Sequence, residues 1–594
     1  MVTRTLITTA DERTWPNDQT EPVLFLGQWC KRYSRRDKWE QLDSLVSPYH
    51  WDDRQKLLID YQYLQELYEE ILTELSEQLN YFHKTNHSLR YWRILIGPWL
   101  GYFVQILFDR WFMLQHAVKQ YNVRKCHIIK RDFISIVPND MDHFSKMFVD
   151  DDWNEAIYAE LLRCCWSDQI NLTPVDGDSI EDRNNNTDNN IKKNVKKFAK
   201  KIMFKYNKIS TKKDEYFFIS SYLPLKTNLK LQIKLGQFPK IWSAQQLPVE
   251  FGSTDISKRN FSLGAYKKND QSFSAVVRRL ITLQIPMVYL EGYAKLVEKT
   301  QQLPWPKKPK AIFTSNSYSA DDIFKCWSAE KVEEGVPLVI GQHGGNFGMN
   351  TFSFHEEHQI KISDQWLSWG WVDNKRSNIT PMGNLKAFGR SIKYDPKGGA
   401  LMVEMTMPRN SYHLYAVPIA SQWLDYLNDQ FLFLRLLPEQ LRQQVLLRLH
   451  ASDYGWDQIE RWKDEMPDVQ LNYGNDNIHS LMRKSRLYIA TYNATTYLES
   501  LSWNVPTIIF WNIEHWELNK QTHPYFELLK KVGIFHETAQ SAAHQMIKVW
   551  DDVDSWWNSE EVQNARIKFC EEYAYISKKP IDKLQNFFEK LVNN

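Results

Sequence analysis

Residues Thr491–Thr496 combine the residue types that hold anions where a helix begins. They follow a short apolar run, Leu487–Ala490, and a helical stretch continues from them to about Trp503. Thr and Asn side chains in such a turn are expected to cap free N–H groups, which together with the helix dipole attract phosphate. The alternative is a turn that only caps a buried helix. The turn residues that we predict to bind a phosphate-bearing donor are Thr491, Asn493, Ala494, Thr495 and Thr496.

The residues after this turn indicate a nucleotide. Glu499 lies about one helical turn further in, where a carboxylate can accept hydrogen bonds from a ribose diol. Asn504-Val505-Pro506 then breaks the helix, and Thr507–Trp511 forms a second apolar run. Strand, helix and strand in this order are the unit of a parallel sheet. The whole stretch therefore predicts the donor pocket of an enzyme that uses a nucleotide sugar.

A glycine-rich loop, GQHGGN, follows another strand candidate, Pro337–Ile340. Its glycines permit positive φ and close backbone approach, as a strand-end loop that touches a ligand requires. We expect His343 to donate to a departing phosphate or to take the proton of an acceptor hydroxyl. The alternative is a turn-forming histidine that bonds the backbone. The loop residues expected to line a cleft are Gln342, Gly344, Gly345 and Asn346.

A third candidate lies near the N-terminus. The loop Ala10–Thr20 follows the strand candidate Thr5–Thr9, and loops after the carboxyl ends of parallel strands face the ligand crevice. Glu12 in this loop is therefore a candidate base on the acceptor side, and the alternative is a surface carboxylate or a charge at a helix N-terminus. The residues alone do not decide between Glu12 and His343 as the base.

The composition describes a large protein without a nucleic-acid signature. The chain has 594 residues, of which 43% are apolar, so it suggests two large domains or more. A net charge of +2 gives no case for a nucleic-acid partner. The six cysteines have neither zinc nor disulfide spacing and predict free thiols in the cytoplasm. Each Asp-Asp pair lies beside an expected helix start, so we predict no metal site and no cofactor.

Two segments raise the question of a membrane. Ile94–Phe108 is apolar but too short to span a bilayer, and we interpret it as a buried core helix. Asp176–Asn190 is predicted to be a polar insertion loop, and a lysine run that contains Lys192 and Lys201 follows it. That run is expected to be a solvated helix face, and the alternative is a contact with anionic lipid or a charged glycan. The protein is thus predicted to be soluble, with peripheral association at the inner face of the membrane as the alternative.

Several motifs resemble a known family. GQHGG, followed by SDQWLSWGW and the turn Phe388–Arg390, resembles the inter-domain region of bacterial capsule and surface-carbohydrate transferases. These include the Kdo transferases of capsule assembly and, more distantly, the polyol-phosphate polymerases. The motifs TTADERTWP, VLFLGQWC, YHWDDR and NHSLRYWRILIGPWLGYF are similar to a family of transferases encoded in surface-polysaccharide and sialic-acid-like sugar gene clusters. The resemblance spans the chain except for the polar loop near residue 180.

This resemblance implies an α/β fold of the GT-B type, in which two Rossmann-like domains face each other across a cleft. Residues 1–390 would form the acceptor-side domain with extra helices and an insertion at 176–213, and 391–398 the linker. Residues 399–575 would form the donor domain, and 576–594 a helix that crosses back. The strand candidate Val445–His450 ends in Arg448 and His450, which we expect to bind the donor, and the resemblance places Arg448 at the donor phosphate.

The expected activity is a metal-independent glycosyl transfer from a nucleotide-activated donor. By analogy with the capsule enzymes we expect a CMP-activated acidic sugar and a surface-polysaccharide, glycan or lipid-linked acceptor. A nucleoside diphosphate sugar and a CDP-activated polyol phosphate are the alternative donors. The rival classes are a non-catalytic scaffold and a UDP-sugar epimerase of the same fold.

Overall fold

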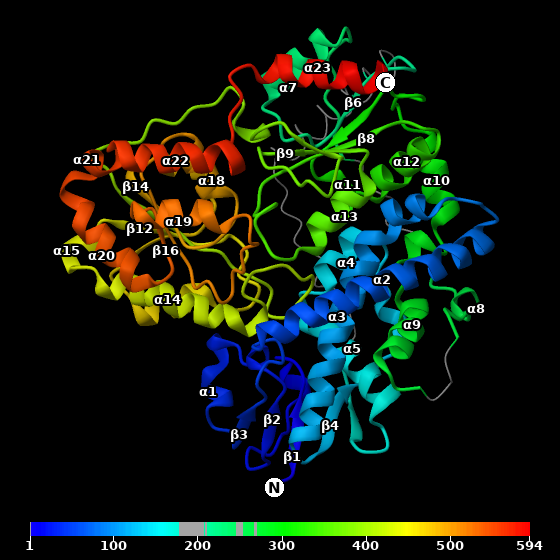
Figure 1. Cartoon of the computed structure of the whole chain (residues 1–594). Helices are drawn as coiled ribbons and strands as arrows, with labels where there is room; N and C mark the ends of the chain where they lie inside the picture. The colour runs from blue at the N-terminus through cyan, green and yellow to red at the C-terminus, as the bar shows by residue number, and fades with distance from the viewer. Residues whose placement is uncertain (1, 178–206, 208–210, 245–252, 266–269, 594) are drawn as a thin grey trace, which may run out of the picture.

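A computed structural model describes the chain except residues 1, 178–206, 208–210, 245–252, 266–269 and 594. In the described residues, all named strands belong to three parallel sheets, and helices surround each sheet (Figure 1). Parallel strands need crossover connections, and most of these connections are helical. The predicted insertion loop and most of its lysine run lie outside the described residues.

The first sheet is formed by the N-terminal part of the chain, at the bottom of Figure 1. Its strand order is β3-β2-β1-β4-β5, and all neighbouring pairs are parallel. The two longest helices, α2 and α3, separate β3 from β4 in sequence. The elements are β1 (Arg4–Ile7), β2 (Val23–Phe25), β3 (Ser44–Val46), α2 (Arg54–His83), α3 (Leu89–Gln120), β4 (Val123–Ile129), α4 (Met141–Met147), α5 (Asp151–Cys165) and β5 (Asn171–Val175).

The second sheet has the order β10-β9-β8-β7-β6 and ends before residue 382. Its strands are short and fully or largely buried, as parallel strands covered on both faces are. The elements are β6 (Phe217–Phe218), α7 (Leu225–Lys234), α8 (Ile256–Arg259), α9 (Phe273–Gln284), α10 (Tyr293–Gln301), β7 (Ile312–Thr314), α11 (Ser317–Ala320), α12 (Asp322–Glu333), β8 (Leu338–Gly341), α13 (Phe354–Ile362), β9 (Gln365–Ser368) and β10 (Ile379–Pro381).

The third sheet has the order β13-β12-β11-β14-β15-β16. Strands β11 and β14 pair over Gly399–Val403 and Ser485–Ala490, so the turn after β14 lies at the carboxyl edge of the sheet. The elements are β11 (Gly399–Val403), α14 (Trp423–Leu436), α15 (Glu439–Arg442), β12 (Val445–Arg448), α16 (Gln458–Glu465), β13 (Gln470–Asn472), α17 (Ile478–Arg483), β14 (Ser485–Ala490), α18 (Thr495–Ser502), β15 (Thr507–Phe510), α19 (His523–Lys531), β16 (Phe535–His536), α20 (Ala539–Val549), α21 (Val553–Trp557), α22 (Glu560–Tyr573) and α23 (Pro580–Asn593).

Helix α3 occupies the centre of the molecule. The predicted apolar segment Ile94–Phe108 lies wholly inside this helix and is buried along its whole length, so the prediction of a core helix is confirmed. No helix in the described parts of the chain has the length and apolarity that crossing a bilayer requires.

The last helix, α23, returns to the second sheet. Its Leu584 and Phe588 are fully buried in one cluster with Phe218 and Phe313, which lie on neighbouring strands. Figure 1 shows α23 beside α7 at the top of the molecule, whereas α22 lies over the third sheet. The chain therefore ties the second and third sheets together after the last strand.

The predicted fold class, α/β with Rossmann-like parallel sheets, is confirmed. The architecture differs in one respect, because residues 1–390 contain two parallel sheets where we predicted one Rossmann-like domain with a helical insertion. The physical reason is that α2 and α3 lie inside the first sheet's chain segment and separate its short strands by long stretches of helix. The domain boundaries themselves stay predictions.

Candidate functional site

Two of the predicted regions meet where the second and third sheets face each other. The loop after β8 contacts the start of α18, because the N–H of Gly345 donates to Oγ1 of Thr495 at 2.8 Å. Gly344 has φ +143°, and a Cβ there would lie 2.2 Å from Thr495 Oγ1. Only glycine can therefore occupy position 344 without moving the two sheets apart. This contact places His343 beside the Thr/Asn turn.

Hydrogen bonds to two tryptophans fix the loop that carries His343. The side-chain Oε1 of Gln342 accepts hydrogen bonds from the N–H of Trp369 (2.9 Å) and from Nε1 of Trp371 (3.1 Å). Gln342 is fully buried, and Asn346 is also buried. The side chain of Gln342 thus orients the loop. We predicted that it would line a cleft, but it is buried inside the protein.

The start of α18 is open, contrary to the prediction that Thr and Asn side chains cap it. Its N-cap is Ala494, and among the described residues no side chain caps the first turn. Thr491 is engaged elsewhere, since its hydroxyl donates to the carbonyl of Val403 and contacts Tyr426 OH at 2.5 Å. Asn493 accepts from Tyr497 OH at 2.8 Å. These residues fix the shape of the turn and leave the helix N–H groups available to a ligand.

Further along α18, two predicted donor residues already have partners. Thr496 Oγ1 accepts from Tyr488 OH at 2.5 Å. Glu499 is buried, and its Oε2 lies 3.0 Å from Nε2 of His479, a residue that the sequence did not single out. His479 is partly exposed, so the pair has one edge toward solvent. A ribose would therefore meet the Glu499–His479 pair and not a free carboxylate.

His343 lies in an apolar setting. Its ring stacks on Tyr222 with centroids 5.9 Å apart and meets Phe347 edge-on at 5.3 Å. Its Nδ1 is buried and has no partner in the described part of the chain. Burial lowers the pKa of His343 to about 3, with smaller contributions from His355 and Lys386. The imidazole is therefore neutral at physiological pH.

Lys386 is a site residue that the sequence did not reveal. It lies in the short 3-10 helix Leu385–Ala387, and its Nζ is 5.0 Å from the ring centre of Tyr222. Burial lowers the pKa of Lys386, while the carboxylate of Glu499 opposes that shift. No ion pair reaches Lys386 among the described residues. A half-buried lysine that forms no ion pair with a neighbouring residue is suited to binding an anion.

Two further histidines extend this region. His355 Nε2 lies 2.6 Å from Tyr318 OH, and its Nδ1 lies 3.2 Å from Tyr102 OH. His413 is stacked between Tyr102 and Tyr415, and its Nδ1 has no partner in the described parts of the chain. Burial lowers the pKa of His355 to about 4 and that of His413 well below the usual value. Both lie in segments without a motif, so no sequence signal could have found them.

Arg448 and His450 lie at the carboxyl end of β12, as predicted. Nη2 of Arg448 donates to the carbonyl of Gly474 at 2.8 Å, whereas its Nε is buried without a partner among the described residues. His450 is exposed, and its Nδ1 accepts from the N–H of Ser452 at 3.1 Å. Arg448 therefore keeps one donor for a ligand, and His450 is bonded within its own loop.

Glu12 begins the short 3-10 helix Glu12–Thr14, which follows β1 of the first sheet. Arg35 binds both carboxylate oxygens, at 2.6 and 2.9 Å, and Lys38 contacts one of them. The hydrogen bond from Arg35 is the largest cause of the lowered pKa of Glu12. Glu12 lines a cavity of about 300 Å³ together with other charged residues, among them Asp11, Arg13, Arg32 and Asp151. A carboxylate held in this way is a weak base, which speaks against the role that we predicted for it.

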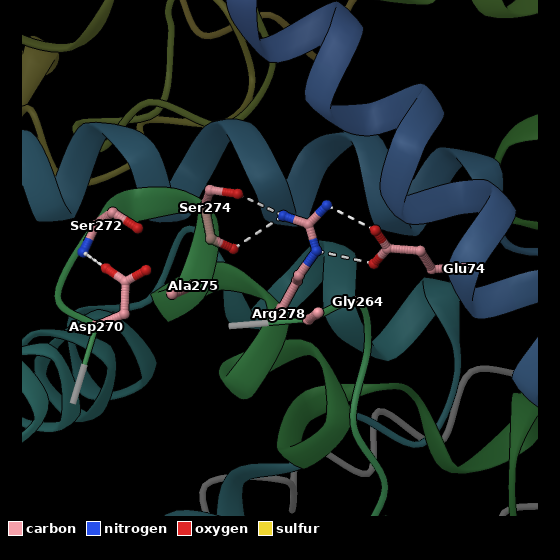
Figure 2. A pocket seen from close by; sticks show the side chains of 8 residues that line it. Glu74, Gly264, Asp270, Ser272, Ser274, Ala275 and Arg278 are labelled. Atoms are coloured by element: carbon pink, nitrogen blue, oxygen red, sulfur yellow. Dashed lines mark hydrogen bonds and ion pairs between the residues drawn. The ribbon is translucent and has the colours of Figure 1, made fainter. Parts of the chain in front are cut away.

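Another cavity, of about 270 Å³, contains no predicted site residue (Figure 2). Arg278 of α9 points toward Glu74 of α2, which binds it at 2.7 and 2.8 Å. The hydroxyl and carbonyl of Ser274 complete the contacts of Arg278. Arg278 also contacts Glu70 of α2 at 3.3 Å, so its charge is paired within the protein and links α9 to α2.

Metal-binding side chains do not gather at these places. Within the described ranges, no group of three or more His, Cys, Asp and Glu side chains is arranged to hold a metal ion. Metal independence is a property of the reaction and therefore stays a prediction.

Solved structures resemble the chain weakly. Anabaena HepE in complex with UDP aligns with 64% of this chain and 100% of its own, at 11% identity and a TM-score of 0.34. The spinosyn rhamnosyltransferase SpnG, complexed with spinosyn aglycone, covers 63% of this chain and 99% of its own at 10% identity and a TM-score of 0.30. WaaG, a glycosyltransferase involved in lipopolysaccharide biosynthesis, covers 50% and 94% at 9% identity and a TM-score of 0.26. Likenesses of this size support no conclusion about the site.

A comparison with curated proteins finds no similar sequence. A comparison with family models does find a match, which covers all three sheets and reaches into α23. The sequence predicted a transferase, and this class is confirmed: the model of the LIC12162 family transferases matches residues 4–588, and the chain belongs to that family.

Proposed function

We propose that this transferase moves a sugar from a nucleotide-activated donor to a carbohydrate acceptor at the junction of the second and third sheets. The observation that carries the proposal is the hydrogen bond from Gly345 to Thr495, which brings His343 to the open start of α18. A helix N-terminus without a side-chain cap attracts phosphate. A neutral imidazole nearby can take a proton.

In the proposed reaction, an acceptor oxygen attacks the anomeric carbon of the donor. The bond from that carbon to the donor phosphate breaks, and the phosphate leaves with the electron pair. The N–H groups of the first turn of α18, the guanidinium of Arg448 and the ammonium of Lys386 would stabilise the leaving charge. His343 would take the proton of the acceptor hydroxyl, and an anionic donor beside His343 would raise its low pKa toward the useful range.

The donor that we propose is a CMP-activated acidic sugar, on the resemblance of the sequence to the capsule Kdo transferases. A nucleoside diphosphate sugar is the alternative, and the Glu499–His479 pair would bind the ribose of either one. The proposed acceptor is a surface polysaccharide or another glycan, free or lipid-linked. We further propose that the reaction needs no metal, that the protein works in the cytoplasm at the inner face of the membrane, and that the second and third sheets act as the two halves of a GT-B enzyme.

A thermal-shift panel of CMP, CDP, UDP, GDP and ADP tests the nucleotide. A ligand at 100 times its Kd raises the stability by about 2.7 kcal/mol, so one selective nucleotide should raise Tm clearly. Turnover with the matching donor should continue in the presence of a chelator. Failure of all five nucleotides to shift Tm, or activity that the chelator abolishes, would contradict the proposal.

A further inference from the structure

Helix α7 carries apolar and basic side chains in two neighbouring rows on its outward side. The apolar row consists of Leu225, Leu229 and Ile233, and the basic row consists of Lys226, Lys230 and Lys234. Each row has i,i+4 spacing, so its members are neighbours on the helix surface. On the opposite side, Leu231 is fully buried against the second sheet. We call the two rows together the α7 face.

The apolar part of this face is unusually exposed. Leu225 is 56% exposed and Ile233 is 60% exposed. Ile241, which follows the helix in the sequence, is also 41% exposed. Single exposed apolar side chains are ordinary, but a contiguous group on one surface indicates an interaction site.

The charges of the face select its partner. Within the described residues, a carboxylate pairs with Lys234, through the exposed Asp582, whereas none pairs with Lys226 or Lys230. A basic row beside an apolar row is typical of helices that lie in the interface of an anionic bilayer. A second copy of the chain would fit poorly, because a two-fold contact sets the same surface against itself and would oppose the lysines.

We propose that the α7 face docks the protein onto an anionic lipid bilayer. The purpose of the docking rests on the proposed function: Tyr222, just before α7, stacks on His343, so the bound membrane would lie near the reacting groups. Figure 1 shows α7 with α23 at the end of the molecule opposite the first sheet. A lipid-linked acceptor would then reach His343 from the bilayer.

Vesicle co-sedimentation of the full chain tests this proposal. The chain should bind vesicles that contain about 30% anionic lipid, bind zwitterionic vesicles far less, and lose affinity as salt rises. The double variant Lys226→Gln/Lys230→Gln should reduce the affinity about thirtyfold, since each lysine contributes electrostatic attraction. The double variant Leu225→Ser/Ile233→Ser should reduce it about tenfold or more.

Ile256 on α8 provides the matched control, because it is 62% exposed, like Ile233, but lies outside the α7 face. Ile256→Ser should bind vesicles as the unchanged protein does, and all variants should keep their Tm. The proposal is overturned if the unchanged protein does not bind anionic vesicles or if both double variants bind them normally. It is also overturned if the double variants change the oligomeric state in the absence of lipid. Nucleotide-induced Tm shifts in the same samples report separately on the proposed function.

Discussion

The two candidate bases lie in surroundings of opposite electrostatic character. Glu12, at the edge of the first sheet, is bound by Arg35 and Lys38, and its pKa is lowered mainly by the hydrogen bond from Arg35. His343, between the second and third sheets, has aromatic neighbours and an Nδ1 without a partner among the described residues. The carboxylate of Glu12 is already paired with neighbouring cations, whereas Nδ1 of His343 can still form a hydrogen bond with a ligand.

The contrast shows how to recognise a site in this chain. Charged residues around Glu12 neutralise one another, as the pairs Arg13–Asp152 and Arg409–Asp151 also do. Buried polar atoms without a partner among the described residues occur in both regions, as Asp151 Oδ1 beside the cavity of Glu12 and as Nδ1 of His343 at the sheet junction, and each such atom needs an explanation. The difference lies in the two candidate bases themselves, because the carboxylate of Glu12 is paired and Nδ1 of His343 is not.

The largest expected effect separates the two bases directly. His343→Ala should lower kcat about a thousandfold, because removal of a general base costs that order of rate. Glu12→Gln should change kcat less than about threefold, since Arg35 and Lys38 leave this carboxylate little basicity. Steady-state turnover at a temperature well below the Tm of each variant measures both effects. A severe loss in Glu12→Gln, with His343→Ala near normal, would reverse the comparison.

The second largest effect on kcat should come from substitution of Lys386. Lys386→Gln is expected to lower kcat about a hundredfold, because one charge that stabilises a leaving phosphate is removed. Lys583 is the matched control: its Nζ lies 5.2 Å from the ring centre of Tyr575 but donates to the carbonyl of Pro381. Lys583→Gln should leave kcat unchanged. Equal losses in both variants would mean that Lys386 has only a structural role.

Gly344 tests the contact between the two sheets. Gly344→Ala places a Cβ 2.2 Å from Thr495 Oγ1 and should lower kcat between tenfold and about a hundredfold by misplacing His343. Gly335 also has a positive φ, of +85°, but a Cβ there would meet nothing within 4 Å. Gly335→Ala therefore carries the backbone strain alone, and its kcat should stay normal. If both variants were fully active, the contact would have no role in catalysis.

The smallest effect concerns stability. Burial raises the pKa of Glu404 to about 8, so the folded state retains a proton that the unfolded state releases above about pH 4.5. Stability from Glu404 is therefore lost as pH rises toward 8, and Glu404→Gln should stabilise the protein there by about 2 kcal/mol. Glu12, whose pKa is lowered, should behave oppositely, and Glu12→Gln should destabilise at neutral pH but not in acid. Urea unfolding at several pH values would show whether the two variants really differ in sign.

The sequence predicts which segments form the candidate site better than it predicts the contacts that their side chains make. Loops at the carboxyl ends of parallel strands converge, so the loop with His343 and the turn with Thr495 were both found. The capping was predicted wrongly, because the hydroxyl of Thr491 bonds Tyr426, which lies on α14 and has no sequence link to the turn. Lys386 escaped notice for the same reason, since only the fold brings it to Tyr222.

The fold shows a similar division. The alternation of strands and helices after residue 216 predicted the second and third sheets. The first sheet was not separated from the second, because β3 has only three residues and the long helices α2 and α3 follow it. Long-range strand pairing of this kind leaves little trace in local patterns.

A crystal structure of the full chain with the nucleotide selected by the thermal-shift panel tests the central claim most directly. We predict phosphate oxygens about 2.7–3.2 Å from backbone nitrogens in the first turn of α18, facing His343. Phosphate bound instead in the cavity beside Glu12, with the start of α18 unoccupied, would contradict the account.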